Sequence, residues 1–348
     1  MMGLNSSSRS VVVRGQWASI ILLLIFVISC AAPWLANDKP LLIHYQDKWF
    51  FPTLESYPET SFGGVFSTQA NYKDPFVAEQ IESNGWWLWA PIRYSYQSIN
   101  YDVNFPSPPT SENWLGVDDQ GRDVLARLLY GIRISLLFSF GLTALVALLA
   151  LFFGGLQGYY GGKADLLGQR FSEVWATVPV LFIVMIVASL IQPGPITLMI
   201  VLALFGWHHL AQQVRAEVLK VRQLDYVQAA LLAGIADFRI IYRHIFPNAL
   251  VATLSNLPFV FSGALGALIT LDFLGFGLPT GYPSLGELLA QGKNNIQAPW
   301  LGAVGCTSVL VLVVLVVLVG EALQEKLATI RSRTTQIKSN NIEGEAAC

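Results

Sequence analysis

Long apolar runs separated by short polar segments occupy most of this chain. About 20 consecutive apolar residues form a helix that crosses a hydrocarbon core of roughly 30 Å. Runs of that length lie near residues 17–36, 134–157, 174–192, 195–214, 249–271 and 300–320. The pattern predicts an all-α membrane protein with six transmembrane helices, the third of them kinked at Pro179.

The segment between the first and second runs has a different pattern. Residues 37–133 contain 18 aromatic side chains, and stretches such as LIHYQDKWFFP and WWLWAPIRYSY are typical of short strands broken by proline. So many aromatic residues favour packing into a small folded cap of mixed or strand-containing structure. At its end, apolar positions within 124–129 fall opposite Arg122 and Arg127, which predicts a helix lying in the membrane interface.

Lysine and arginine are distributed unevenly among the short connecting segments. With the N-terminus inside the cell, Lys293 is the only basic residue in the short outer loops, whereas the inner segments are rich in Lys and Arg. The positive-inside rule therefore predicts that both termini are cytoplasmic. The expected organisation is a cytoplasmic N-terminus (1–16), a first transmembrane helix (17–36), an outer cap with its interfacial helix (37–133), a transmembrane core (134–320) and a cytoplasmic tail (321–348).

The end of the first run allows two interpretations. Val27-Ile28-Ser29-Cys30 resembles a lipoprotein cleavage site after a short apolar core, and cleavage there would remove the first helix. The apolar character continues through Leu35, as in an uncleaved membrane anchor, which favours retention of the helix.

One polar, helix-forming segment interrupts the apolar runs on the inner side. Residues 224–248 read LDYVQAALLAGIADFRIIYRHIFPN, with apolar positions at helical spacing on both sides of Gly234. Glycine supplies the backbone freedom that a sharp turn needs, so we expect two short helices with a hinge at Gly234. Asp237 falls in the first turn of the second helix, where an acidic group complements the helix dipole. Pro247 is expected to end that helix.

Composition narrows the chemistry. The chain is 53% hydrophobic and 13% charged with a net charge of -2, which excludes a strongly basic nucleic-acid-binding protein. A phosphate-binding G-x-x-x-x-G-K-[ST] loop is absent, because Gln157 and Ala164 stand where the sequence around Gly162-Lys163 would need Gly and Ser or Thr. An ATP-driven cycle would therefore need separate ATPase chains.

Catalytic and metal-binding patterns are also absent from the sequence. It contains no nucleophile elbow, no H-E-x-x-H and no paired carboxylates within the apolar runs. His208-His209 is interpreted as an interfacial pair, since neighbours on a helix point about 100° apart. No ionisable residue lies near the middle of a run, which disfavours an ion-coupled carrier. We expect no catalytic residue, cofactor or metal on this chain.

The inner polar segment resembles the cytoplasmic EAA loop of ATP-binding-cassette (ABC) importer permeases. The matching residues, on a loop that spans 215–248, are Gln228, Ala229, Ala230, Gly234, His244 and Pro247. Gln228 stands where the family usually has Glu. Three further stretches resemble the dipeptide and oligopeptide branch of that family: LGVDDQGRDVLARLLYGIRISL (115–136), LDFLGFGLP (271–279) and PSLGELLAQGKNNIQAPW (283–300). With its aromatic cap, the chain is most similar to the second permease subunit of the Yej-type systems.

The resemblance implies a function and partners. The fold would be that of a type I ABC importer permease with a periplasmic insertion, in the bacterial inner membrane. The chain would form half of a path for oligopeptides or microcin C-type compounds, beside a homologous permease, two ABC ATPases or one fused ATPase, and a periplasmic solute-binding protein. ATP and Mg²⁺ would be bound by the ATPases. The coupling residues would be Gln228, Ala229, Ala230, Gly234, Asp237, His244 and Pro247.

Two alternatives stay open at this point. Related permeases carry nickel or other small solutes, so one alternative keeps the architecture and changes the cargo. A membrane-anchored enzyme or sensor that uses the outer cap is a more distant alternative, and the missing catalytic motifs argue against it.

Overall fold

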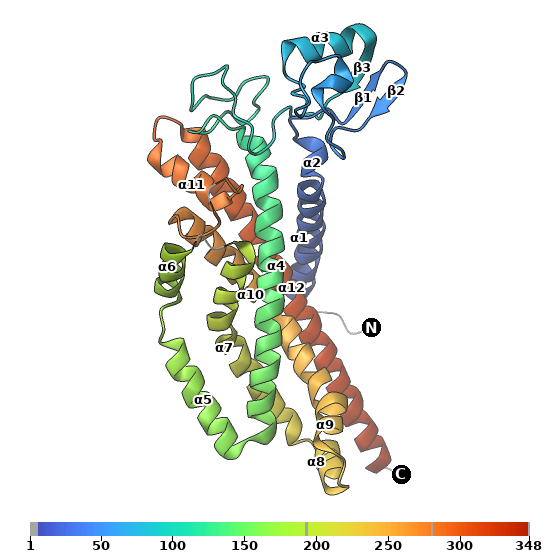
Figure 1. Ribbon diagram of the computed structural model, residues 1–348. Helices are drawn as coiled ribbons and strands as arrows, with labels where there is room; N and C mark the ends of the chain where they lie inside the picture. The colour runs from blue at the N-terminus through green and yellow to red at the C-terminus, as the bar shows by residue number, and fades with distance from the viewer. Residues whose placement is uncertain (1–5, 192–193, 280, 347–348) are drawn as a thin grey trace.

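Helices dominate the computed structural model, which describes residues 6–191, 194–279 and 281–346 (Figure 1). Within these residues, five helices are long and apolar enough to cross a membrane, and one bent helix pair raises the number to six. The predicted all-α membrane fold with six spans is therefore confirmed. The spanning helices are α1 (Ser6–Cys30), α4 (Val124–Tyr160), the pair α5 (Gly162–Ala176) and α6 (Val180–Leu190), α7 (Pro195–Arg222), α10 (Phe246–Phe273) and α12 (Pro299–Ala346).

The third span is broken, as the sequence predicts. Helices α5 and α6 meet at 62°. Pro179 precedes the first residue of α6 with an extended backbone, and its ring removes the N–H that would continue α5. The kink at Pro179 is thus confirmed as a complete break between two helices.

The second span is longer than its apolar run. Helix α4 continues for 37 residues, roughly 55 Å at 1.5 Å per residue. The segment expected to form a separate interfacial helix is the first turns of α4, so that prediction is wrong. The reason is that its polar face is buried against other protein elements rather than solvated. Asp123 begins the helix by accepting from the Ala126 N–H at 2.7 Å, and Arg127 is fully buried.

A charge network holds the outer end of α4 against α11 (Leu285–Asn294). Arg122 donates to Asp118 at 2.8 Å and to Glu287 at 2.8 Å. Arg127 also donates to Glu287, and Asp118 accepts from Gln291 at 3.2 Å. Charge-assisted hydrogen bonds therefore join two sequence-distant segments, residues 118–127 and 287–291.

The outer cap contains the strands that its aromatic-rich sequence predicts. Strands β1 (Leu42–Tyr45), β2 (Lys48–Phe50) and β3 (Gly85–Leu88) form an antiparallel sheet in the order β2-β1-β3. Gln46 and Asp47 both have positive φ, as a two-residue hairpin turn requires. The short helices η1 (Glu59–Phe62) and α3 (Pro75–Asn84) complete the cap, and α2 (Ala32–Leu35) joins it to α1. Its apolar core consists of Ile43, Tyr45, Phe62, Ala70, Tyr72, Val77 and Ile81.

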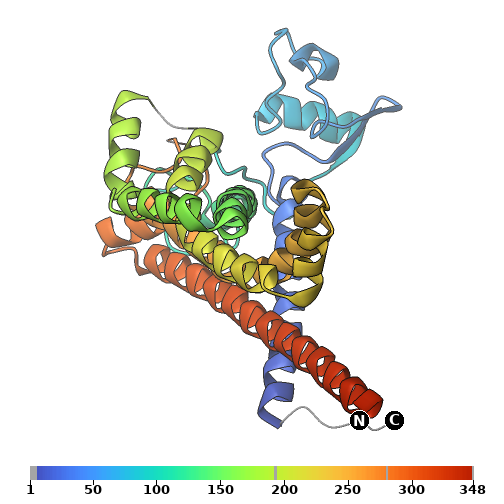
Figure 2. The same ribbon diagram turned by 90° about the horizontal axis from the view of Figure 1, so that it is seen from below.

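The helices cross closely at positions where glycine removes the side chain. A Cβ at Gly154 of α4 would lie 2.4 Å from the Ala211 carbonyl oxygen of α7, and one at Gly15 of α1 would lie 2.0 Å from the Ala322 Cβ of α12. Figure 2 shows α1 crossing α12 and the cap placed to one side of the bundle. Because glycine lets the backbones approach, these helix pairs pack without an intervening layer of side chains.

Candidate functional site

A helical hairpin lies at the end of the bundle opposite the cap (Figure 1). Helix α8 (Asp225–Leu232) is followed by a turn and then by α9 (Asp237–Ile240). At the turn, Gly234 has φ +71° and donates to the Leu231 carbonyl, and Ile235 donates to the Ala230 carbonyl. This pair of bonds is the Schellman motif, which ends a helix on a left-handed residue. The predicted two short helices with a hinge at Gly234 are therefore confirmed.

The second helix of the hairpin does not end at Pro247, so that prediction is wrong. Helix α9 continues through a π-helical turn, η2 (Ile241–Ile245), directly into α10, where Pro247 lies in the first turn. The Phe246 N–H bonds to the Ile241 carbonyl, five residues back. A wider turn leaves room for the proline ring, which would otherwise meet the carbonyl four residues earlier. Hairpin and spanning helix thus form one continuous rod.

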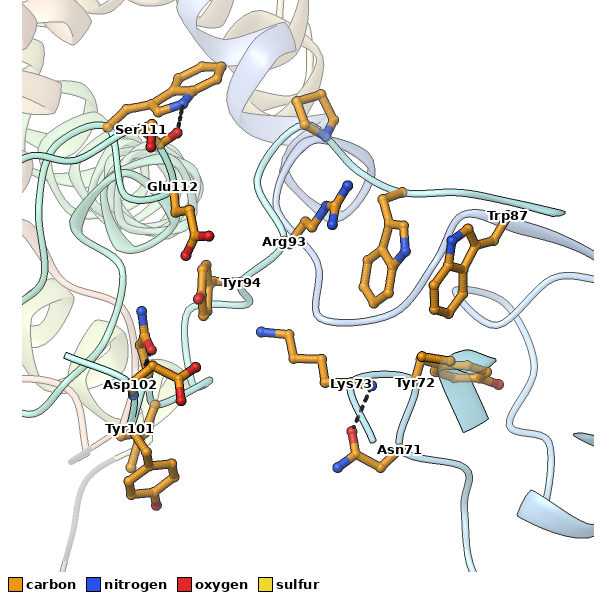
Figure 3. Close-up of a pocket in the computed structure, with 16 residues that line it drawn as sticks. Asn71, Tyr72, Lys73, Trp87, Arg93, Tyr94, Tyr101, Asp102, Ser111 and Glu112 are labelled. Atoms are coloured by element: carbon orange, nitrogen blue, oxygen red, sulfur yellow. Dashed lines mark hydrogen bonds between the residues drawn. The ribbon is translucent and has the colours of Figure 1, made fainter. Parts of the chain in front are cut away.

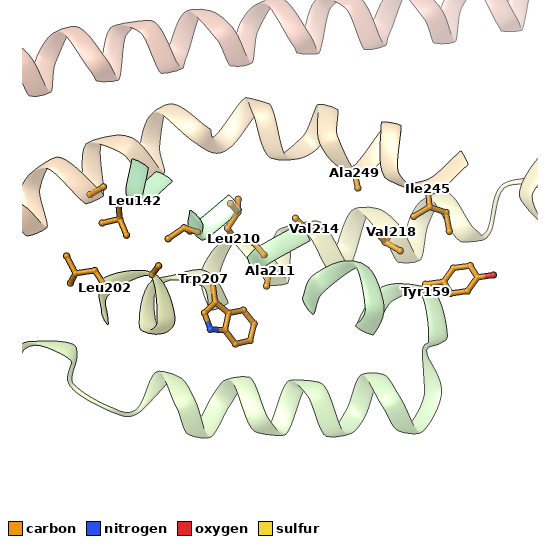
Figure 4. Close-up of a cluster of buried hydrophobic side chains, with 14 of the residues drawn as sticks. Leu142, Tyr159, Leu202, Trp207, Leu210, Ala211, Val214, Val218, Ile245 and Ala249 are labelled. Atoms are coloured by element: carbon orange, nitrogen blue, oxygen red, sulfur yellow. The ribbon is translucent and has the colours of Figure 1, made fainter. Parts of the chain in front are cut away.

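One side of the hairpin belongs to the transmembrane core. Val227, Ala230, Ile240 and Ile245 are buried and join a single apolar cluster with residues of α4 and α7. Figure 4 shows this cluster extending from Leu142 and Leu202 to Ile245 beside Tyr159. The buried members are close-packed, so we expect the hairpin and the inner ends of α4 and α7 to move as one unit. The whole cluster comprises Phe138, Leu142, Val146, Ala150, Tyr159, Val184, Leu198, Leu202, Ala203, Trp207, Leu210, Ala211, Val214, Val218, Val221, Val227, Ala230, Ile240, Ile245, Ala249, Ala264, Leu268 and Leu271.

The opposite side of the hairpin exposes large apolar side chains. Leu232 is 90% exposed, Phe238 80% and Tyr242 70%. The Phe238 and Tyr242 rings stack at a centroid distance of 6.4 Å. We call Leu232, Phe238 and Tyr242 the hairpin tip. Apolar side chains that gather at one protruding point mark a surface that a partner covers.

The hairpin tip is not among the residues predicted from the sequence, although its spacing carries a signal. Phe238 and Tyr242 are spaced i, i+4 and fall on the helix face opposite the buried stripe of Ile240 and Ile245. Two apolar stripes on one short helix indicate one face for the core and another for a partner.

The structure places the other predicted residues within the hairpin or at its edges. Ala229 is exposed on α8, and Ala230 is buried beneath it. Gln228 donates from Nε2 to the Arg222 carbonyl at 2.8 Å, at the end of α7. Asp237 accepts from the Tyr159 hydroxyl at 2.7 Å. The His244 ring packs against Tyr226 of α8 at 5.6 Å, so both arms of the hairpin contact each other.

An apolar cavity of about 330 Å³ lies among the spanning helices α4, α6, α7 and α10. Its lining includes Leu142, Gly206, His209 and Gly263. Three of these helices, α4, α7 and α10, also hold the hairpin. Among residues 6–191, 194–279 and 281–346, no group of three His, Cys, Asp or Glu side chains is arranged to hold a metal ion.

These features define a membrane-embedded component of a transport system. The family described as "Binding-protein-dependent transport system inner membrane component" matches residues 148–329, from the middle of α4 through the hairpin to α12. The chain belongs to this family. It is accordingly a multi-pass protein of the inner membrane, and members of such systems work with ATPase and substrate-binding partners.

Relatives resemble the chain over almost its whole length. It is 51% identical to the inner membrane ABC transporter permease protein YejE of Escherichia coli (strain K12), over 90% of this chain and 92% of that protein. It is 43% identical to the peptidoglycan transport system permease protein YejE of Agrobacterium fabrum, over 90% and 88%. Identity to the oligopeptide transport system permease protein OppC of Lactococcus lactis subsp. cremoris is 30%, over 66% and 80%. All three relatives are transport permeases.

Proposed function

We propose that this chain is a permease subunit of an ATP-driven importer for oligopeptides or peptide-like compounds, microcin C-type molecules among them. The names of the relatives support this cargo, since they specify oligopeptide and peptidoglycan transport. Peptidoglycan fragments carry short peptides, so both names share one chemistry. The same names favour peptides over nickel as the cargo.

The hairpin couples the permease to an ATPase, and one observation carries this proposal. The hairpin tip is exposed, while the other side of the same hairpin is part of the transmembrane core. Because the hairpin is packed rigidly against the transmembrane core, a displacement of the hairpin tip moves the core helices as a rigid body. ATP closes the ATPase dimer, the tip moves with the ATPase groove in which it is seated, and α10 follows because α9, η2 and α10 are continuous.

Two side-chain hydrogen bonds connect the hairpin to the helices that line the cavity. Tyr159 links α4 to Asp237, and Gln228 links α8 to the end of α7. Helices α4, α7 and α10 line the apolar cavity, so a displacement of the hairpin changes the width of that cavity. In the complete transporter a homologous permease supplies the other half of the path.

Orientation and partners complete the proposal. The distribution of Lys and Arg supports a cytoplasmic position for both termini and the hairpin, with the cap on the periplasmic side facing a solute-binding protein. The boundaries 1–16, 17–36, 37–133, 134–320 and 321–348 stay predictions on this scheme. ATP and Mg²⁺ are bound by two ATPase chains or one fused ATPase, and this chain contributes no catalytic group.

The test uses the transporter assembled in proteoliposomes. The double substitution Phe238→Ala with Tyr242→Ala removes two rings of the hairpin tip and should lower ATP-driven tripeptide uptake at least about tenfold, as loss of an interface hot spot does. Phe66→Ala, at a 65% exposed aromatic of the cap, is the matched control and should keep full uptake. Undiminished uptake by the double variant would contradict the coupling role. Failure of the unmodified transporter to move peptides would contradict the cargo.

A further inference from the structure

A cavity of about 800 Å³ opens within the outer segment (Figure 3), at the end of the molecule opposite the hairpin (Figure 1). The loop before α3, the strand residue Trp87 and the chain from 89 to 114 form its walls. Its volume lies in the range of small-ligand sites, which is about 300–1,000 Å³. The coupling mechanism uses none of its residues.

Two cations of the cavity lie over aromatic rings. The Lys73 Nζ is 3.7 Å from the centroid of the Tyr94 ring, and the Arg93 guanidinium carbon is 5.6 Å from that of Trp89. Such contacts orient a cation without neutralising it. Within the described residues, neither Lys73 nor Arg93 has a carboxylate within 4.0 Å.

Two carboxylates line the same cavity. Asp102 and Glu112 are exposed there, and in the part of the chain that the structure describes neither forms an ion pair. Figure 3 shows the Lys73 ammonium and both carboxylates pointing into the same space. Burial lowers the pKa of Lys73, and the neighbouring carboxylates, Asp102 and Glu112 among them, oppose that shift. The charges thus act on one another across the cavity without closing it.

Charges of both signs, held apart on aromatic walls, match a ligand that carries both charges itself. We propose that this cavity binds a zwitterionic peptide, with its carboxylate at Lys73 and Arg93 and its ammonium group at Asp102 and Glu112. Trp87, Trp89 and Tyr94 contact the apolar part of the peptide. The ligand class rests on the proposed function, and the site itself would lie on the permease, outside the transmembrane cavity.

The test measures peptide binding to the full-length chain in nanodiscs. The probe is the tripeptide Ala-Phe-Ala with free termini, compared with the same peptide acetylated and amidated. Blocking both ends should weaken binding about tenfold, because each end loses a charge-assisted contact. Lys73→Gln and Glu112→Gln should each weaken binding of the free peptide about fivefold and leave binding of the blocked peptide unchanged. Lys48→Gln and Glu82→Gln, at exposed cap residues outside the cavity, are matched controls and should bind like wild type.

A second measurement locates the bound peptide. A tripeptide with a central benzoylphenylalanine should cross-link on illumination to fragments that contain residues 86–94 or 111–114. Arg93→Gln and Asp102→Asn repeat the charge test if either first variant lowers the thermal stability of the chain. Equal binding of free and blocked peptides, wild-type affinity in the charge variants, or cross-links confined to other fragments would each overturn the site. Peptide uptake by the assembled transporter reports separately on the proposed function, which stands if uptake continues while the cavity test fails.

Discussion

The hydroxyl of Tyr159, at the inner end of α4, donates to the carboxylate of Asp237, at the start of α9, over 2.7 Å. The two residues are 78 positions apart in the chain. Tyr159 is 5% exposed, so the bond starts from the core and ends on the hairpin. It is a direct polar contact between the transmembrane core and the proposed ATPase-binding element.

Removing this bond should loosen the hairpin. Tyr159→Phe keeps the ring in the core and deletes the donor, at a cost of about 1 kcal/mol to hairpin docking. We expect peptide uptake per ATP hydrolysed to fall severalfold in the reconstituted transporter. Tyr160→Phe is the matched control, because the Tyr160 ring is 55% exposed. Equal coupling ratios in the two variants would show that the bond has no part in transmission.

The backbone at Gly234 gives a second prediction. A Cβ at this position would have no atom within 4 Å, but φ is +71°. Strain rather than a clash therefore sets the cost, about 1–2 kcal/mol for a residue with Cβ. Gly234→Ala should lower both thermal stability and uptake, whereas Gly234→Asn should lower them less, since asparagine tolerates this conformation. Gly266→Ala in α10 is the control, with an equally open Cβ site and no positive φ, and should be neutral or stabilising. An alanine variant at 234 as stable as wild type would refute the strain argument.

The side-chain amide of Gln228 gives a third prediction. Its Nε2 donates to the last residue of α7, Arg222, whose carbonyl lacks a partner within the helix. Gln228→Glu removes the donor and places a carboxylate near a carbonyl oxygen, so we expect a loss of about 1 kcal/mol in the free energy of unfolding. Gln223→Glu, five residues earlier and exposed, should have little effect. The readout is the shift in denaturation midpoint, and an unchanged midpoint for Gln228→Glu argues against the amide cap.

The charge network between α4 and α11 gives a fourth prediction. Arg127 is fully buried and pairs with Glu287 and, at 3.6 Å, with the buried Asp118, so Arg127→Met leaves both carboxylates to Arg122 alone. Breaking one partner of a buried pair costs about 3–5 kcal/mol. Arg170→Met, in the exposed pair with Glu173, should cost less than about 1 kcal/mol. Thermal unfolding in nanodiscs compares the stabilities of the two variants. A loss for Arg127→Met as small as that for Arg170→Met would mean that the network contributes little to stability.

The environment of Lys73 gives a prediction on pH. Burial lowers the pKa of Lys73 from its ordinary value of 10.5, although nearby carboxylates oppose the shift. At pH 8.5 a larger fraction of Lys73 is neutral than of a lysine with that ordinary pKa, so an amine-acetylating reagent should modify Lys73 faster than the side chain of N-acetyl-lysine amide. For a base whose pKa is depressed on folding, the cost of holding the charge is fully present below the folded-state pKa and is lost as the pH rises from that pKa to the unfolded value. Lys73→Met removes this cost, so the variant should be more stable than wild type below the folded-state pKa of Lys73 and should lose that advantage as the pH approaches 10.5. Equal acetylation rates at Lys73 and in N-acetyl-lysine amide would contradict the depressed pKa.

Apolar periodicity was sufficient to predict the spans, the break at Pro179 and the hinge at Gly234. These depend on local chemistry: hydrocarbon length, a missing N–H and a positive φ. The interfacial helix and the helix end at Pro247 were wrong because both depended on contacts from elsewhere. The sequence around Arg127 predicts a solvated side chain, because its partner Glu287 lies 160 residues away and leaves no local signal. Pro247 predicts a helix end, because the π-helical turn that accommodates its ring spans five residues and leaves no periodic pattern in the sequence.

The hairpin tip and the cap cavity could not be predicted for a different reason. Exposure of Phe238 depends on which face of α9 the core takes, and the sequence offered apolar residues on both faces. The cavity gathers Lys73, Tyr94 and Glu112 from separate loops with no common spacing. Only the folded cap brings them together.

The unbroken length of α4 has one more consequence. Its first turn is clamped to α11 by the buried arginine, and its last turn touches the hairpin through Tyr159. Helix α4 thus contacts α11 at its outer end and the hairpin at its inner end. On the proposed arrangement, the binding protein and the ATPases would contact opposite ends of this one helix, so a tilt of α4 would couple them without a relay of side chains.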